Sequence, residues 1–165
     1  EEVALGVPGT LQGDVADVVA VDNGTIAPGQ NTAEYGVTIA VQDETGPFDY
    51  HLTRKLIGLC DDHGIDSQRD VFPYYFSDSA AALRAGFDIR HALIGFGADS
   101  SHGWERTHLS SLPSIAELLT LYAQNGPVVA RDQRMLGPLE GFPHQVDIDE
   151  LSAPPQALPD PKEFL

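Results

Sequence analysis

The sequence predicts an α/β fold, because short β-like runs alternate along its middle with helical stretches. Its 165 residues suffice for one domain, and a hydrophobic content of 42% leaves material for a buried core. Four runs rich in Val, Ile and aromatic residues are typical of strands. They are residues 17–21, 37–42, 70–76 and 90–96.

Three helices are expected between and after these strands. Each has apolar residues or small residues at helical spacing, and each has residues at its ends that start or stop a helix. Pro113 fits the first turn of the last one, where a missing N–H costs nothing. The expected helices are residues 52–63, stopped by Gly64; residues 80–85, capped by Ser77 or Asp78 and stopped by Gly86; and a helix that opens at Ser110 or Ser111 and ends at Gly126.

The composition changes at Gly137, after which prolines recur up to Pro161. Proline is excluded from helix interiors, so this part reads as largely irregular. We therefore expect a folded region over residues 1–136 and a Pro-rich tail over residues 137–165. The acidic stretch at residues 147–150 is interpreted as solvated surface.

The formal net charge is −16, which argues against binding to nucleic acid or to anionic membranes. Cationic ligands or basic partners are favoured instead. No apolar run is long enough to span a membrane. The only cysteine, Cys60, rules out an internal disulfide framework, and its apolar helical surroundings predict a buried, inert thiol.

Three common catalytic signatures are missing: the G-x-S-x-G nucleophile elbow, the H-E-x-x-H helix and the G-x-x-x-x-G-K-[ST] phosphate loop. What remains is a set of carboxylates and imidazoles near strand ends. In α/β sheets, ligands collect in the crevice at the carboxyl ends of strands, so we expect a site there.

The first candidate is the pair Glu1-Glu2. Adjacent residues leaving a strand point to opposite sides, so one carboxylate can bind a metal ion while the other acts as a general base. The alternative is solvated charge at a chain start.

The second candidate is Asp22, which follows the apolar run at residues 18–21. A carboxylate at the end of a buried strand can meet a divalent cation or a substrate amine. The alternative is a turn, because Asp22-Asn23-Gly24 is typical turn chemistry.

Two further candidates lie in later loops. The segment from His102 to His108 follows a strand, and at most one of its two His need be a metal ligand. The alternative is an ordinary surface or core role for both. Asp78 can line a pocket, although helix capping is a sufficient explanation for it.

Together these motifs resemble a family of dinuclear metallo-aminopeptidases that includes glutamyl, deblocking and tetrahedral enzymes, some of them labelled cellulases. The matching segments follow one another in the family's order over about residues 1–124. Residues 46–55 and 99–108 are similar to one osmoprotectant-associated bacterial branch. The motif-bearing segments are Glu1-Glu2-Val3-Ala4-Leu5, residues 18–22, residues 76–80 and residues 106–111.

The resemblance implies a three-layer α/β sandwich with a mixed sheet, of which this chain is the C-terminal part of a zinc-peptidase-like catalytic domain. It implies that Glu1 is the general base, that Glu2 and His108 bind one metal ion and that Asp22 binds the other. Asp78 would contact substrate. The implied cofactors are two divalent ions, zinc first, with cobalt or manganese as alternatives.

The same resemblance implies a cytoplasmic peptide hydrolase that acts on a free N-terminus and is homo-oligomeric at full length. The family's N-terminal His and bridging Asp ligands are absent from these residues, so we expect this chain alone to be inactive. Ala4 and Thr107 depart from the family's usual Gly and Tyr. Two alternatives stay open: a binding or assembly module with the same fold but no catalysis, and a glycosidase that uses two carboxylates.

Overall fold

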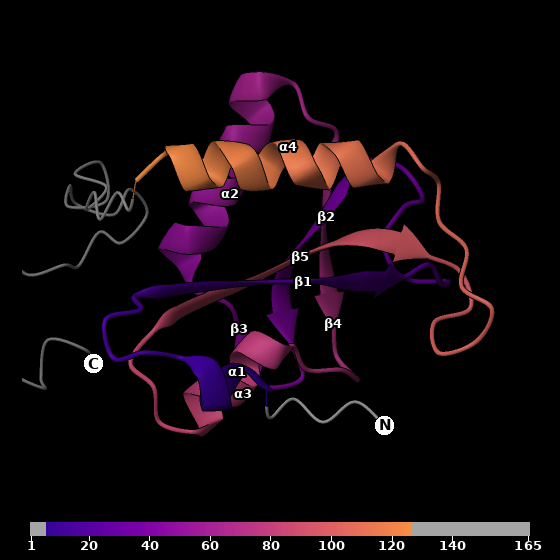
Figure 1. Ribbon diagram of the computed structural model, residues 1–165. Helices are drawn as coiled ribbons and strands as arrows, with labels where there is room; N and C mark the ends of the chain where they lie inside the picture. Colours follow the sequence, from indigo (N-terminus) through magenta and orange to yellow (C-terminus); the bar gives the residue numbers. More distant parts are fainter. Residues whose placement is uncertain (1–5, 127–165) are drawn as a thin grey trace, which may run out of the picture. The chain divides into compact units, whose positions relative to one another are not determined.

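The computed structural model describes residues 6–126, which form a mixed β-sheet with helices on both faces (Figure 1). Helices α2 (Tyr50–His63) and α4 (Ser111–Gln124) cover one face. The short helices α1 (Gly6–Thr10) and α3 (Asp78–Arg84) pack together on the other side. The expected α/β fold with a mixed sheet is confirmed.

The sheet order is β1–β5–β2–β4, with the short β3 paired to the end of β2. β1 pairs with β5 in parallel, and β2 pairs with β4 in parallel, but β5 and β2 are antiparallel. The carboxyl ends of the two parallel pairs therefore point in opposite directions. The strands are Asp17–Thr25, Val37–Asp43, Gly46–Pro47, Ser67–Phe72 and Arg90–Ala98.

All four expected strands end at other residues in the structure; β2 and β5 are only one and two residues longer, but β1 and β4 differ more. β4 begins at Ser67 and ends at Phe72, because Pro73 cannot donate to a ladder and residues 73–76 leave the sheet. β1 continues past residue 21 to Thr25, held by pairing that runs to Thr25↔Ala98. The turn interpretation of Asp22-Asn23-Gly24 is therefore wrong, since a partner strand overrides local turn chemistry.

The helix ends follow the sequence closely. The Asp49 carboxylate accepts a hydrogen bond from the Leu52 amide at 2.8 Å, and Gly64 ends α2 in the left-handed region at φ 68°. Ser77, not Asp78, caps α3 by accepting from the Ala80 amide. Cys60 is buried in α2 as expected, and burial raises the pKa of its thiol.

The main core lies between the sheet and the α2/α4 layer. Leu52 and Leu56 of α2, Leu118 of α4 and Ile39 and Ile94 of the sheet are almost fully buried. A second, smaller cluster of Ala40, Phe48, Phe72 and Leu93 lies on the opposite face. Alternation along each strand thus sends side chains into two cores, which is the pattern of a sheet covered on both faces.

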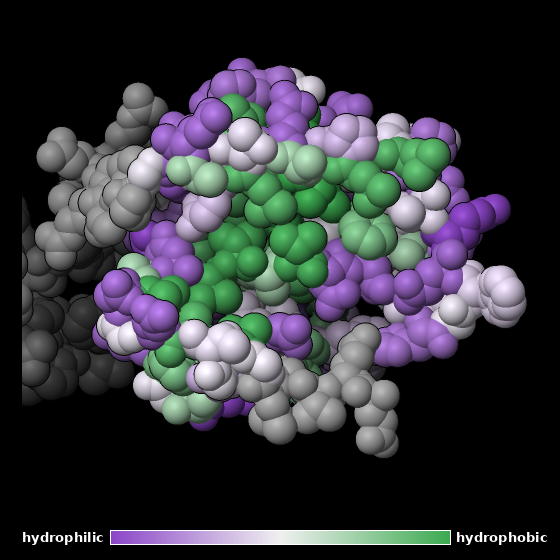
Figure 2. Space-filling view, viewed as in Figure 1, coloured by the Kyte–Doolittle hydropathy of each residue, from purple (hydrophilic) through white to green (hydrophobic). Residues whose placement is uncertain are grey.

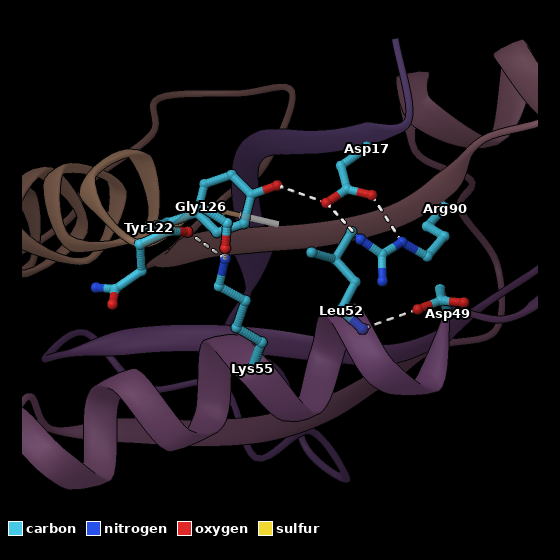
Figure 3. A network of polar contacts seen from close by, with 8 residues as sticks. Asp17, Asp49, Leu52, Lys55, Arg90, Tyr122 and Gly126 are labelled. Atoms are coloured by element: carbon cyan, nitrogen blue, oxygen red, sulfur yellow. Dashed lines mark hydrogen bonds and ion pairs between the residues drawn. The ribbon is translucent and has the colours of Figure 1, made fainter. Parts of the chain in front are cut away.

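A polar network fastens the end of α4 to the sheet and to α2 (Figure 3). Arg90 donates to both oxygens of Asp17, at 2.7 and 2.8 Å, and the Tyr122 hydroxyl donates to Asp17 at 3.1 Å. Lys55 donates to the carbonyl of Gly126 at 3.0 Å and lies over the Tyr122 ring. These contacts join residues far apart in the sequence, so they fix how α4 sits on the sheet.

Replacing Tyr122 by Phe is expected to remove an alkaline instability. Burial and the Asp17 carboxylate raise the pKa of Tyr122 to about 12 from an ordinary 10.0. The hydroxyl therefore contributes fully to folding below pH 10, and its contribution declines between pH 10 and 12. In urea unfolding, Y122F should cost about 1 kcal/mol at pH 9 and lose less further stability at pH 11 than the parent does. Equal losses for both proteins would contradict this role.

β1 forms one edge of the described sheet. Apolar side chains gather on the face of the molecule that carries this strand (Figure 2), and Val21 of β1 is 47% exposed. An apolar sheet edge of this kind is normally paired or covered.

Several sequence expectations lie outside the described residues: the Glu1-Glu2 pair, the boundary at residues 136–137, and the Pro-rich tail with its acidic stretch at residues 147–150. Within residues 6–126, no helix is both long and apolar enough to cross a membrane.

Candidate functional site

A small pocket of about 60 Å³ contains one of the predicted site residues, Asp22. It lies on the α3 side of the sheet, because its apolar wall includes Phe72 and Leu93 of the smaller cluster. Period-two alternation also places Asp22 on the same face as Ala20. The pocket is lined by Asp22, Asn23, Thr25, Asp43, Phe72, Tyr75, Phe76, Ser77, Leu93, Ser101 and His102.

Asp22 is held by close packing of β1 on β5. Its partner in the register is Gly95, where a Cβ atom would come within 2.3 Å of the Asp22 carbonyl oxygen. Only glycine permits this approach. Asp22 is exposed, and its carboxylate accepts a hydrogen bond from the Asn23 backbone amide at 2.7 Å. A carboxylate on a paired strand is a group that can bind a cation or an amine.

The pocket collects residues from the carboxyl ends of several strands. Thr25 ends β1, Asp43 ends β2 and Phe72 ends β4, while Ser101 and His102 lie on the loop after β5. Because the sheet is mixed, these ends do not all point in the same direction. Asp22 itself lies three residues before the end of β1.

Asp43 lies under the pocket and anchors α3. The residue is 1% exposed. Its carboxylate accepts hydrogen bonds from the Ser77 amide at 2.9 Å and from the Thr45 amide and hydroxyl at 2.8 and 2.6 Å. The Ser77 hydroxyl lies 2.7 Å from that of Ser79. Asp43 was not a sequence-predicted site residue, although its position after an apolar run is the same signal that singled out Asp22.

The Ser79 hydroxyl, which contacts that of Ser77, also lies 3.3 Å from Nδ1 of His91. Burial lowers the pKa of His91, while the carboxylates of Asp43 and Asp49 act in the opposite direction. A neutral imidazole under α3 acts as a structural link between that helix and β5. It does not line the pocket.

His108 lies in the loop before α4 and is exposed. Its ring packs against Tyr35 at a centroid distance of 4.6 Å, and its Nδ1 lies 2.6 Å from the Ser110 hydroxyl. The Ser110 backbone amide donates to the same Nδ1 at 3.2 Å, so in this contact Nδ1 is the acceptor. His108 does not line the pocket that contains Asp22.

Asp78 is exposed in the first turn of α3 and does not line the pocket. Its negative charge suits a helix N-terminus. Among the described residues, no group of three or more His, Cys, Asp or Glu side chains is arranged to hold a metal ion. The structure therefore brings Asp22 into a pocket with His102 and leaves His108 and Asp78 outside it.

Comparison with known proteins decides the family. The model of the family described as M42 glutamyl aminopeptidase matches residues 1–118. The chain belongs to this M42 family. YhfE of Bacillus subtilis (strain 168), which is named as an aminopeptidase, is 46% identical over 125 residues, covering 76% of this chain and 36% of YhfE.

Two solved structures share the fold. PhTET1-12s, described as a dodecamer, has a TM-score of 0.62 at 18% identity, over 73% of this chain and 36% of that one. Pyrococcus horikoshii TET1 peptidase has a TM-score of 0.57 at 19% identity, over 66% of this chain and 33% of that one. The M42 chain thus spans about a third of the length of these relatives.

Proposed function

We propose that this M42 chain contributes to a metal-dependent aminopeptidase, which hydrolyses peptides with a two-metal site and a glutamate general base. The observation that carries the proposal is the exposed Asp22 carboxylate, held rigidly on β1 at a pocket, in a chain of an aminopeptidase family. Within the described residues β1 is an edge strand with apolar side chains around it, and such a surface could carry a larger catalytic domain.

The donor set fits divalent ions. Glu2 and His108 would hold one ion and Asp22 the other, so the site combines carboxylate oxygens with an imidazole nitrogen, as zinc prefers. Cobalt and manganese accept the same ligands. His108 is exposed in the loop before α4, so its ring is accessible to an ion.

When bound, the ions would polarise the scissile carbonyl and make the attacking water more acidic. Glu1 takes the proton from that water and delivers it to the leaving amine. Carboxylates near the site hold the free amino group of the substrate, and we assign Asp78 to this task. The net charge of −16 suits a cationic N-terminus and opposes binding to nucleic acid.

At full length, we propose a homo-oligomer located in the cytoplasm. Support for assembly comes from the two structural neighbours, one described as a dodecamer and the other as forming a tetrahedron or a large octahedral shell.

A substrate pair that differs only at the N-terminus tests this function. The full-length protein should release the first residue of a free peptide about 10- to 100-fold faster than that of its N-acetylated form, since acetylation removes a charge-assisted hydrogen bond. Release is measured by quantifying the free amino acid. Equal rates would contradict an aminopeptidase, and no hydrolysis of either peptide would favour a binding or assembly module.

A further inference from the structure

His102 is the part of the His102–His108 motif that the proposed metal site does not use. It lies on the loop after β5, and it lines the same pocket as Asp22. The loop begins and ends at a bridge in which the Asp99 amide donates to the Arg106 carbonyl at 2.9 Å. The Arg106 guanidinium also contacts Glu34 at 3.2 Å, so both ends of the loop are tied down.

The loop backbone is in an unusual conformation. Ser100 has φ 58° and His102 has φ 64°, although neither is glycine. The left-handed region costs about 1 kcal/mol for each such residue, so other contacts must hold the loop there.

Glu105 supplies those contacts. One carboxylate oxygen, Oε1, accepts from the His102 amide at 3.0 Å and from the Asn23 side-chain amide at 3.1 Å. The Ser101 hydroxyl donates to Oδ1 of the Asn23 side chain at 3.4 Å. Because Asn23 follows Asp22 on β1, this brace fixes the position of His102 relative to the pocket.

The His102 ring makes no hydrogen bond within residues 6–126, in contrast to its neighbours. Asn23, Ser101 and Glu105 use their polar groups on one another. The ring lies parallel to that of Tyr75 at a centroid distance of 6.4 Å. His102 is exposed and lines the pocket, so its ring can contact a ligand that enters from solvent.

The rest of the pocket restricts that ligand. Its volume of about 60 Å³ admits only a few atoms. Asp22 and Asp43 would repel a carboxylate, while Phe72 and Leu93 provide apolar contact. These features together fit a small, uncharged side chain that has both an oxygen and a methyl or methylene group.

We propose that His102 is a specificity-determining residue, which donates a hydrogen bond to the side-chain oxygen of a small, neutral, polar N-terminal residue of the substrate. This inference rests on the proposed function, because Asp22 lines this pocket and is assigned there as a metal ligand, so the substrate's first residue would bind close to His102. Threonine has the required chemistry, and valine is its apolar isostere.

Two peptides that differ only in Thr or Val at the N-terminus test the proposal in the full-length, metal-loaded protein. The kcat/KM ratio for Thr over Val should fall about fivefold in H102A, the equivalent of one hydrogen bond worth about 1 kcal/mol. The change should come mainly from a higher KM for the Thr peptide. The Val peptide should be hydrolysed at nearly the parent rate.

Three further variants distinguish a loss of substrate recognition by His102 from a general effect on the structure of the protein. E105A should lower the Thr/Val ratio as H102A does, because the brace is lost, whereas E105Q keeps an acceptor oxygen and should restore the ratio. H63A changes an exposed His outside the pocket and should leave the ratio unchanged.

The two proposals fail in different ways. If the parent protein releases Thr and Val but H102A keeps the parent's Thr/Val ratio of kcat/KM, His102 does not bind the substrate side chain. Only this inference is then overturned. If the parent releases neither residue, the aminopeptidase function is overturned and the inference falls with it.

Discussion

Glu1→Gln is expected to abolish turnover while leaving the metal content unchanged. A general base contributes about 10²- to 10⁴-fold to a rate, and the amide of Gln cannot accept the proton of the attacking water. Because Gln has nearly the same size and a neutral charge, substrate binding should change little, so kcat falls and KM does not. The release of amino acids is measured by steady-state kinetics and metal by elemental analysis.

Glu2→Gln is the matched control at the neighbouring position. As a metal ligand, Glu2 should affect both properties, so E2Q is expected to lose activity together with one equivalent of metal. Retained activity in E1Q would exclude Glu1 as the base. Identical behaviour of the two variants would contradict the division of roles between them.

Asp22→Ala is expected to remove one of two metal equivalents and to lower kcat by about 10²- to 10³-fold. The loss follows from the several kcal/mol of transition-state stabilisation that a metal ion supplies. Asp22 is exposed on a strand fixed by β5, so the thermal unfolding midpoint of the metal-free protein should change little.

Asp62→Ala provides the control, because Asp62 is an exposed carboxylate in the last turn of α2, away from the pocket. D62A should keep both equivalents and full activity. If D22A also keeps two equivalents, Asp22 is not a ligand, and its place at the pocket would have to serve substrate binding instead.

Local chemistry made α2, α3 and α4 predictable, whereas the short α1 was not expected. Gly64 ends α2 where the sequence indicates, Ser77 was one of two expected caps of α3, and Pro113 lies in the first turn of α4. These signals act within a few residues, so neighbouring amino acids are enough to read them.

Strand ends were less predictable, because pairing depends on residues distant in the sequence. Asp22, Asn23 and Gly24 have typical turn chemistry, yet β5 extends the ladder through all three. Pro73 was a visible signal that β4 ends at Phe72, but the aromatic residues after it favoured a longer strand.

In the site, too, local features were predictable and long-range contacts were not. The residue types at Asp22 and His102 indicated polar chemistry, but the sequence could not group them, since 80 positions separate the two. The brace from Glu105 to Asn23 spans 82 positions and depends on the β1–β5 register. Asp43 was missed because its role depends on the N-cap of α3 lying against the last residue of β2.

Metal restoration is the most direct measurement of the central claim. Metal is removed from the full-length protein with a chelator, zinc is added back in steps, and release of an N-terminal residue is followed at each step. A two-metal aminopeptidase should be inactive without metal and should regain activity to a plateau at two equivalents per chain. Full activity in the metal-free protein would contradict metal-dependent hydrolysis, and a plateau at one equivalent would contradict the two-metal site.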